Sequence, residues 1–122
     1  TAEVFRRLGR VAEPARFAPL ERALAGERVA LDELVGSNDL EAPAFALSPA
    51  LAAMYTALVR GGAGRVRMSG SGSSLFAFFA DATAAETAAA ALPRGVHWFR
   101  VSMLGREAWR RAGGFESPAG GS

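Results

Sequence analysis

The sequence predicts a single α+β domain, with helices in its first half and a small antiparallel sheet in its second half. Three observations support this prediction. The chain has 122 residues and is 50% hydrophobic, which suits one globular core. Apolar residues recur at helical spacing up to Arg60 and then begin to alternate with polar ones. The pair Gly61 and Gly62 separates the two patterns.

Two short helices are expected near the start of the chain. Thr1 is a suitable N-cap for a helix over residues 2–8, because its hydroxyl can accept from an N–H that has no partner in the first turn. A second helix is expected over residues 18–25. It ends at Gly26, a residue type that commonly follows the last turn of a helix.

Two further helices begin at residues that typically cap helices. Asn38 and Glu41 have the spacing of a capping box, in which each side chain satisfies a backbone N–H at the start of a helix. Ser48, followed by proline, begins a longer helix that continues to Arg60. Asp39 and Glu41 are the best carboxylate pair for acid–base chemistry. The capping box, however, explains Glu41 without catalysis.

The second half of the sequence has the pattern of a sheet covered by a helix. Residues 65–69 alternate as in a strand with one buried face, and residues 75–79 are apolar on both faces, as in a central strand. Residues 82–92 predict an Ala-rich helix, and residues 97–104 predict the last strand. If a further strand lies upstream of Thr1, the order becomes a ferredoxin-like βαββαβ two-layer sandwich that lacks its first strand here.

The end of the chain differs from the rest in composition. Residues 113–122 combine glycine, serine and proline and have no core pattern, so we expect a disordered C-terminal tail. Residues 1–112 would then form the domain.

Composition removes several classes of function. The chain has no Cys and one His, and all 14 of its basic residues are Arg. A disulfide scaffold, a thiolate zinc site, a cysteine nucleophile and all lysine chemistry are therefore excluded. We expect no metal site and no catalytic residue in this chain. His97 is interpreted as a surface or edge residue.

Charge and hydropathy give no reason to expect a nucleic acid or a membrane as a partner. The formal net charge is only +2, although the sequence pI is about 10.4, and acidic and basic residues are interspersed. The apolar stretch from Leu75 to Ala80 is far shorter than the roughly 20 residues of a membrane-spanning helix. Trp98, Trp109 and the phenylalanines near residue 76 are interpreted as packing residues rather than a base-stacking surface.

The most informative motif is Gly70-Ser71-Gly72-Ser73, which lies between two predicted strands. Glycines allow backbone conformations that other residues avoid, and successive N–H groups can then converge on an anion. An ordinary Gly/Ser hairpin turn is the alternative interpretation. A Walker loop is excluded because there is no lysine, and the sequence contains no nucleophile elbow.

The segment from Met68 to Phe76 resembles the third conserved motif of the GHMP small-molecule kinases. Residues 1–5 and 37–41 narrow the resemblance to the branch that phosphorylates a diphosphocytidyl derivative of methylerythritol in non-mevalonate isoprenoid biosynthesis. The resemblance extends from Thr1 to about Leu104.

This resemblance implies a cytoplasmic enzyme that transfers phosphate from ATP, with Mg²⁺, to the 2-hydroxyl of a small-molecule substrate in a cleft between two domains. The ATP loop and the catalytic Asp and Lys would belong to an N-terminal kinase domain that this sequence lacks. Thr1 would face the substrate, Phe5 would pack on the cytosine ring, and Gly70–Ser73 would steady the phosphate site. Residues 1–122 alone would bind no cofactor and would be inactive.

Two other functions remain open from the residues. One is a free-standing ferredoxin-like module that binds a small regulatory ligand. The other is an RNA-binding sheet domain, which salt-sensitive binding of single-stranded RNA would favour. A Gly-Leu-Gly phosphate loop encoded upstream of Thr1 would favour the kinase, and a start codon without that motif would favour the module.

Overall fold

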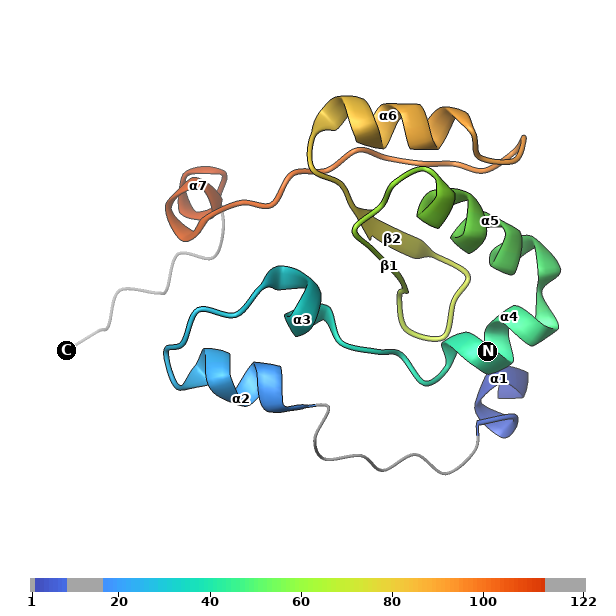
Figure 1. The fold of residues 1–122 in the computed structure, drawn as a ribbon, viewed down its shortest axis with the longest axis horizontal. Coiled ribbons are helices and arrows are strands. Elements are labelled where there is room, and N and C mark those ends of the chain that lie inside the picture. Colours follow the sequence, from blue (N-terminus) through green and yellow to red (C-terminus); the bar gives the residue numbers. More distant parts are fainter. Residues whose placement is uncertain (1, 9–16, 114–122) are drawn as a thin grey trace.

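The computed structural model describes residues 2–8 and 17–113 (Figure 1). Within these residues there are seven helices and two strands, which confirms the α+β class. In chain order they are α1 (Ala2–Arg6), α2 (Ala18–Leu24), α3 (Leu31–Val35), α4 (Glu41–Leu47), α5 (Pro49–Arg60), β1 (Arg65–Met68), β2 (Leu75–Phe78), α6 (Ala82–Ala90) and α7 (Arg106–Arg111).

The two strands form an antiparallel hairpin against which the longer helices lie. Arg65 pairs with Phe78, and Met68 pairs with Leu75. Helix α5 contacts both β1 and α6, and Figure 1 shows it next to the hairpin. The close approach of α5 to α6 requires glycine at Gly61, because a Cβ there would lie 2.6 Å from the Ala88 Cβ.

The hydrophobic core lies where α1, α4 and α5 meet the loop end of the hairpin. Its buried members come from four different elements. They are Val4, Ala44, Leu51 and Met68, and Leu40, Phe45, Met54 and Leu75 pack against them. The core therefore holds the first helix, the central helices and the β1–β2 connection together.

The predicted start of α5 is confirmed, and a side chain caps it. Ser48 Oγ accepts a hydrogen bond from the Leu51 N–H at 3.3 Å, at the start of α5. Two helices were not predicted, and both lack such a signal: α3 follows Ala30 and α7 follows Gly105, with no side-chain cap at either. The Thr1 cap and residues 114–122 of the predicted tail lie outside the described residues.

The prediction of a last strand over residues 97–104 is wrong. This segment is extended but pairs with no strand of the described chain, and Phe99 and Val101 are 86% and 84% exposed. Alternating apolar residues specify a face of a strand, but a strand also needs a neighbour for its N–H and C=O groups. One contact, from Arg100 Nη1 to Glu86 Oε1 at 3.4 Å, joins the segment to α6.

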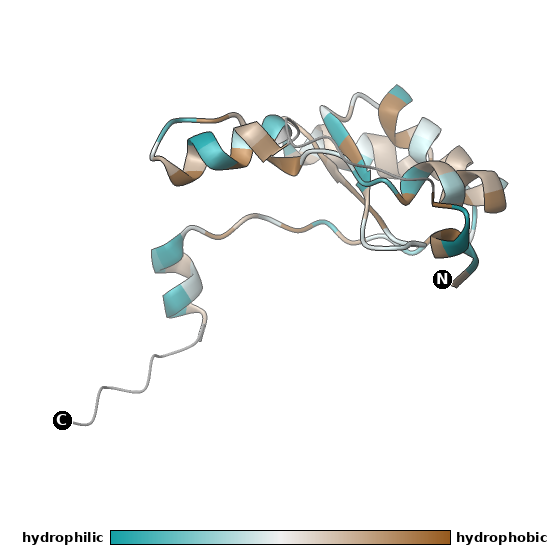
Figure 2. Cartoon of the chain, turned by 90° about the horizontal axis from the view of Figure 1, so that it is seen from below, coloured by the Kyte–Doolittle hydropathy of each residue, from teal (hydrophilic) through white to brown (hydrophobic). Residues whose placement is uncertain are grey.

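The prediction that residues 75–79 form a central strand is also wrong for the described chain. Strand β2 is paired only with β1, and Phe76 is 41% exposed. The ferredoxin-like order needs four strands, so that detail stays a prediction. Figure 2 shows the segment after α6 as an extended chain, with hydrophobic residues along it, that leads away to α7.

Within the described ranges, no single helix is long and apolar enough to cross a membrane. Helices α4 and α5 pass that test of length and composition only as a pair, and they are bent by 119° at their junction.

We predict that residues 1–122 on their own self-associate, because the segment at 97–104 leaves apolar side chains in water and β2 has no second strand neighbour in the described chain. Light scattering should show species larger than a monomer. The double substitution of Val101 and Met103 by glutamate should shift the population toward monomer, while Ala90→Glu on the exposed face of α6 should not. A monodisperse wild-type monomer would contradict this account.

Candidate functional site

The connection between β1 and β2 is a tight loop closed by its own backbone. The Ser69 N–H donates to the Ser74 carbonyl at 2.8 Å, and the Gly72 N–H donates to the Ser69 carbonyl at 3.1 Å. Gly70 and Gly72 have φ angles of +57° and +89°. The conformational role predicted for the two glycines is therefore confirmed, because other residues rarely adopt positive φ.

One side of this loop rests on the hydrophobic core. A Cβ at Gly72 would lie 3.0 Å from Met68 Sδ and 3.6 Å from Leu51 Cδ2. Both of these neighbours are buried. The loop is thus seated against buried side chains, and a larger residue at position 72 would press on Met68 as well as strain the φ angle.

The other side of the loop presents hydrogen-bond donors. The N–H groups of Gly70, Ser71 and Ser73 donate to no acceptor among the described residues, and serine hydroxyls lie beside them. Backbone N–H groups and hydroxyls of this kind suit the oxygens of a phosphate. They do not suit Mg²⁺, whose protein ligands are mainly carboxylates. Within residues 2–8 and 17–113, no three His, Asp or Glu side chains form a metal-binding group.

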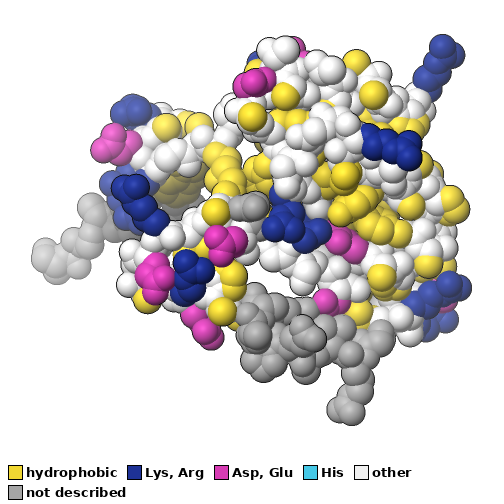
Figure 3. All heavy atoms as spheres, in the orientation of Figure 1, with side chains coloured by type: hydrophobic (Ala, Val, Ile, Leu, Met, Phe, Trp, Pro, Cys, Tyr) yellow, Lys and Arg dark blue, Asp and Glu magenta, His cyan; other side chains and the backbone are white. Residues whose placement is uncertain are grey.

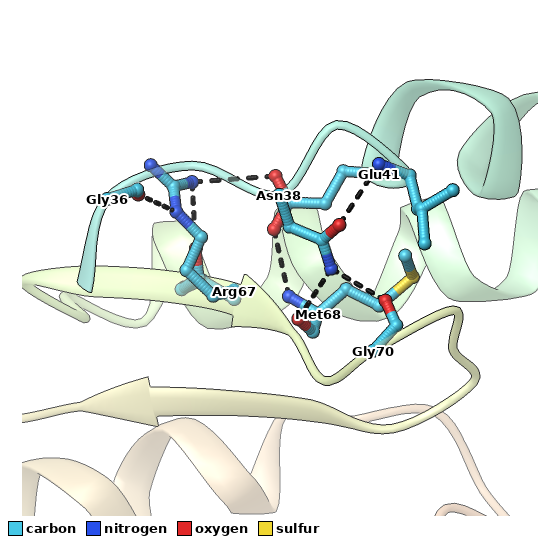
Figure 4. Close-up of polar contacts among 8 residues, drawn as sticks. Gly36, Asn38, Glu41, Arg67, Met68 and Gly70 are labelled. Carbon is cyan, nitrogen blue, oxygen red and sulfur yellow. Dashed lines mark hydrogen bonds and ion pairs between the residues drawn. The ribbon is translucent and has the colours of Figure 1, made fainter. Parts of the chain in front are cut away.

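Asn38 holds the start of this loop from the segment between α3 and α4 (Figure 4). Its Nδ2 donates to the Met68 carbonyl at 3.0 Å and to the Gly70 carbonyl at 2.7 Å. Its Oδ1 accepts from the Leu40 N–H at 3.0 Å, which fixes the side chain at the entry to α4. Every polar atom of the Asn38 amide therefore has a backbone partner.

Glu41 holds the last residue of β1. Its Oε1 accepts from the Met68 N–H at 2.8 Å, and its Oε2 lies 3.5 Å from Arg67 Nη1. Arg67 Nε in turn donates to the Gly36 carbonyl at 2.6 Å. The side chains of Glu41 and Arg67 are each only 14% exposed, so this ion pair is shielded from water.

The predicted capping box is therefore wrong. Asn38 does accept from a backbone N–H near the start of α4, but Glu41 points to the strand instead of back to Asn38. The reason is that Met68 lies on the free edge of β1, where its N–H has no strand partner and competes for the carboxylate. Glu41 is a structural group here, so the paired-carboxylate interpretation of Asp39 and Glu41 has no support.

The remaining predicted residues are distributed as follows. Phe5 lies on α1 and is 55% exposed, while its neighbour Val4 is buried in the same cluster as Met68. Helix α1 and the glycine loop thus lie at the same end of the molecule, as both views show (Figures 1 and 2). Thr1 lies outside the described residues. His97 is exposed in the extended segment, as predicted.

Charge is scattered on the surface in view. Figure 3 shows basic and acidic side chains next to one another among hydrophobic ones, without a continuous basic stripe on that face. Exposed ion pairs such as those of Arg22 with Glu27 and Glu33 have the same mixed character.

Comparison with known families identifies the chain. Residues 20–97 match the family described as GHMP kinases C terminal, and this range begins within α2 and contains α3 to α6 and the glycine loop. The chain belongs to the GHMP kinase family. The resemblance seen in Met68–Phe76 is therefore confirmed, and this GHMP kinase chain contains the C-terminal region of the family fold.

Curated relatives narrow the comparison to one kind of kinase. The chain is 45% identical over 112 residues to "4-diphosphocytidyl-2-C-methyl-D-erythritol kinase" of Methylobacterium radiotolerans, covering 85% of this chain and 38% of the relative. It is 46% identical over 99 residues to the protein of that name from Sinorhizobium medicae, covering 77% of this chain and 32% of the relative. The protein of that name from Rhodopseudomonas palustris is 52% identical over 74 residues, 57% of this chain and 24% of the relative.

The GHMP kinase chain thus spans about a third of the length of the first two of these relatives. No solved structure matches it significantly.

We predict that Glu41→Ala lowers the free energy of unfolding by about 1–3 kcal/mol, because it leaves the Met68 N–H without its acceptor and removes the carboxylate beside the Arg67 guanidinium. Glu41→Gln should cost less, since the amide oxygen can still accept from Met68. Glu107→Ala removes an exposed pair with Arg111 and should change stability by at most about 0.5 kcal/mol. Urea unfolding measures all three. Equal losses for Glu41→Ala and Glu107→Ala would show that the Glu41 contact is not stabilising.

Proposed function

We propose that this chain is the C-terminal, substrate-side part of an ATP-dependent kinase that phosphorylates the 2-hydroxyl of 4-diphosphocytidyl-2-C-methyl-D-erythritol. The observation that carries the proposal is the 45% identity to a kinase of that name across 85% of the chain. Because the alignment covers 85% of the chain, it includes both the glycine loop and the segment that contains Asn38 and Glu41.

The chemistry of the glycine loop agrees with a supporting role in phosphoryl transfer. That reaction depends on positioning and on stabilising charge around the transferred group. The outward N–H groups and hydroxyls of residues 70–73 could steady a phosphate, but they supply no base. In our proposal, ATP and Mg²⁺ bind to the complete protein, and the catalytic Asp and Lys come from its N-terminal domain. This chain has no lysine to offer.

The substrate side of the proposal rests on α1. Phe5 presents an aromatic ring to solvent from a helix that the core holds through Val4. An exposed ring on a fixed helix suits stacking on a pyrimidine, which contributes about 1–3 kcal/mol per base in nucleic-acid-binding proteins. We propose that Phe5 packs on the cytosine ring and that Thr1, which precedes α1 in sequence, faces the same substrate.

The proposed partner of this chain is the N-terminal kinase domain. A preceding strand would extend the sheet toward the ferredoxin-like order and bury apolar surface at residues 97–104, which the described chain leaves in water. We expect the complete enzyme to act in the cytoplasm, where ATP is available, and residues 1–112 to form its C-terminal domain.

We predict that residues 1–122 alone do not consume ATP in the presence of the diphosphocytidyl substrate, because the chain lacks the lysine and the ATP loop of the proposed mechanism. The protein encoded by the whole reading frame that contains them should transfer phosphate to the 2-hydroxyl, as ³¹P NMR of the product would show. Turnover by residues 1–122 would refute the claim that they are inactive alone. No turnover by the complete protein would refute the proposed kinase activity.

In the complete protein, Phe5→Ala should raise KM for the diphosphocytidyl substrate by about 10-fold, the loss expected for one stacking contact. KM for ATP should stay the same. Arg6→Ala, on the exposed face of the same helix, serves as the matched control and should leave both constants close to wild type. An unchanged substrate KM in Phe5→Ala would rule out the assigned contact.

A further inference from the structure

The outer edge of β1 has hydrogen-bonding groups that no strand satisfies. The Ser69 N–H bonds across the hairpin to Ser74, so the alternation of antiparallel strands directs the N–H and C=O of Met68 to the opposite edge. There Glu41 accepts from the Met68 N–H and Asn38 donates to the Met68 carbonyl. These two side chains take the place of a neighbouring strand at this position.

Asn38 continues from this edge into the glycine loop. The shorter of its two donated bonds, at 2.7 Å, goes to the carbonyl of Gly70. The peptide unit that joins Gly70 to Ser71 is trans, so its C=O and N–H point in opposite directions. A side chain that holds the Gly70 carbonyl therefore also determines where the Ser71 N–H points.

The peptide unit that joins Met68 to Ser69 shows the same opposite directions of C=O and N–H. Asn38 holds the Met68 carbonyl, and the Ser69 N–H of the same unit points the other way, to the Ser74 carbonyl at 2.8 Å. The Ser71 N–H, by contrast, meets no acceptor among the described residues. It is directed away from Asn38 and is available to a ligand.

We propose that Asn38 is a positioning residue for the glycine loop: by holding the Gly70 carbonyl, it aims the Ser71 N–H at the phosphate group that the loop supports. The identity of that ligand rests on the proposed function, whereas the direction of the amide rests on geometry alone. Asn38 acts through Gly70 and Ser71 and touches no reacting atom.

The chemistry of asparagine fits this role better than that of aspartate. Its Nδ2 has two N–H groups, one for each carbonyl, and its Oδ1 accepts from Leu40. The substitution Asn38→Asp keeps the acceptor for Leu40 and the size of the side chain. It replaces the donor with a carboxylate oxygen that repels the carbonyls of Met68 and Gly70, so it reverses the contact to the loop without creating a cavity.

The test uses the complete protein in three forms: wild type, Asn38→Asp and Ser48→Ala. Ser48→Ala removes the cap of α5 and serves as the control for lost stability, because the hydrogen bond of the Ser48 side chain goes to Leu51 and not to the loop. The orientation of the Ser71 N–H is measured from its amide chemical shift and residual dipolar coupling by NMR. Steady-state kinetics give kcat and KM for ATP and for the diphosphocytidyl substrate.

In Asn38→Asp we expect the Ser71 amide to reorient and kcat/KM for ATP to fall about 10- to 100-fold, the range expected when a positioned group shifts by about 1 Å. KM for the diphosphocytidyl substrate should stay close to wild type. The deficit should shrink as the pH is lowered, because a protonated carboxyl can donate to the Gly70 carbonyl again. Ser48→Ala should show neither the amide change nor this pH dependence.

An unmoved Ser71 amide in Asn38→Asp would overturn the proposal, and so would kinetics that match those of Ser48→Ala. If Asn38→Asp does not fold, Asn38→Ser provides the same test, since its oxygen can accept from Leu40 but is too short to reach Gly70. If the wild-type protein shows no turnover, the proposed function fails, whereas the Ser71 measurement still decides whether Asn38 sets the loop.

Discussion

The constraint on which the rest of the structure depends is the free edge of β1 at Met68. Its outward N–H and C=O groups are close to a buried core, where an unpaired polar group costs about 1–3 kcal/mol. Glu41 and Asn38 supply the two missing partners, and both come from the entry to α4. One pair of contacts thus joins the helical half of the chain to the hairpin and places the glycine loop over the core.

This arrangement gives the two edges of the hairpin different roles. The β1 edge is closed at Met68 by side chains, so another strand cannot pair there without displacing them. On the other side, β2 has no strand neighbour within the described chain, and the extended segment beyond α6 exposes Phe99 and Val101.

Sequence patterns predicted the features that depend on local chemistry. The cap at Ser48, the β1 alternation and the two glycines of the loop were all predicted, because each is set by a residue and its near neighbours. A last strand was predicted over residues 97–104 but does not form, and the contact of Glu41 was not predicted. Both depend on partners distant in sequence, because residues 97–104 lack a neighbouring strand and Glu41 bonds to a residue 27 positions away. The contact of Glu41 could have been predicted only if it had been known that Met68 lies on a free strand edge.

The central claim is that the glycine loop, held by Asn38, lies against the phosphates of a nucleotide bound to the rest of the enzyme. A crystal structure of the complete protein with a non-hydrolysable ATP analogue tests this most directly. The account predicts a phosphate oxygen within hydrogen-bond distance of the Ser71 N–H, with Asn38 Nδ2 still bonded to the Gly70 carbonyl. A loop on a face remote from the nucleotide, or a Ser71 N–H turned toward the core, would contradict it.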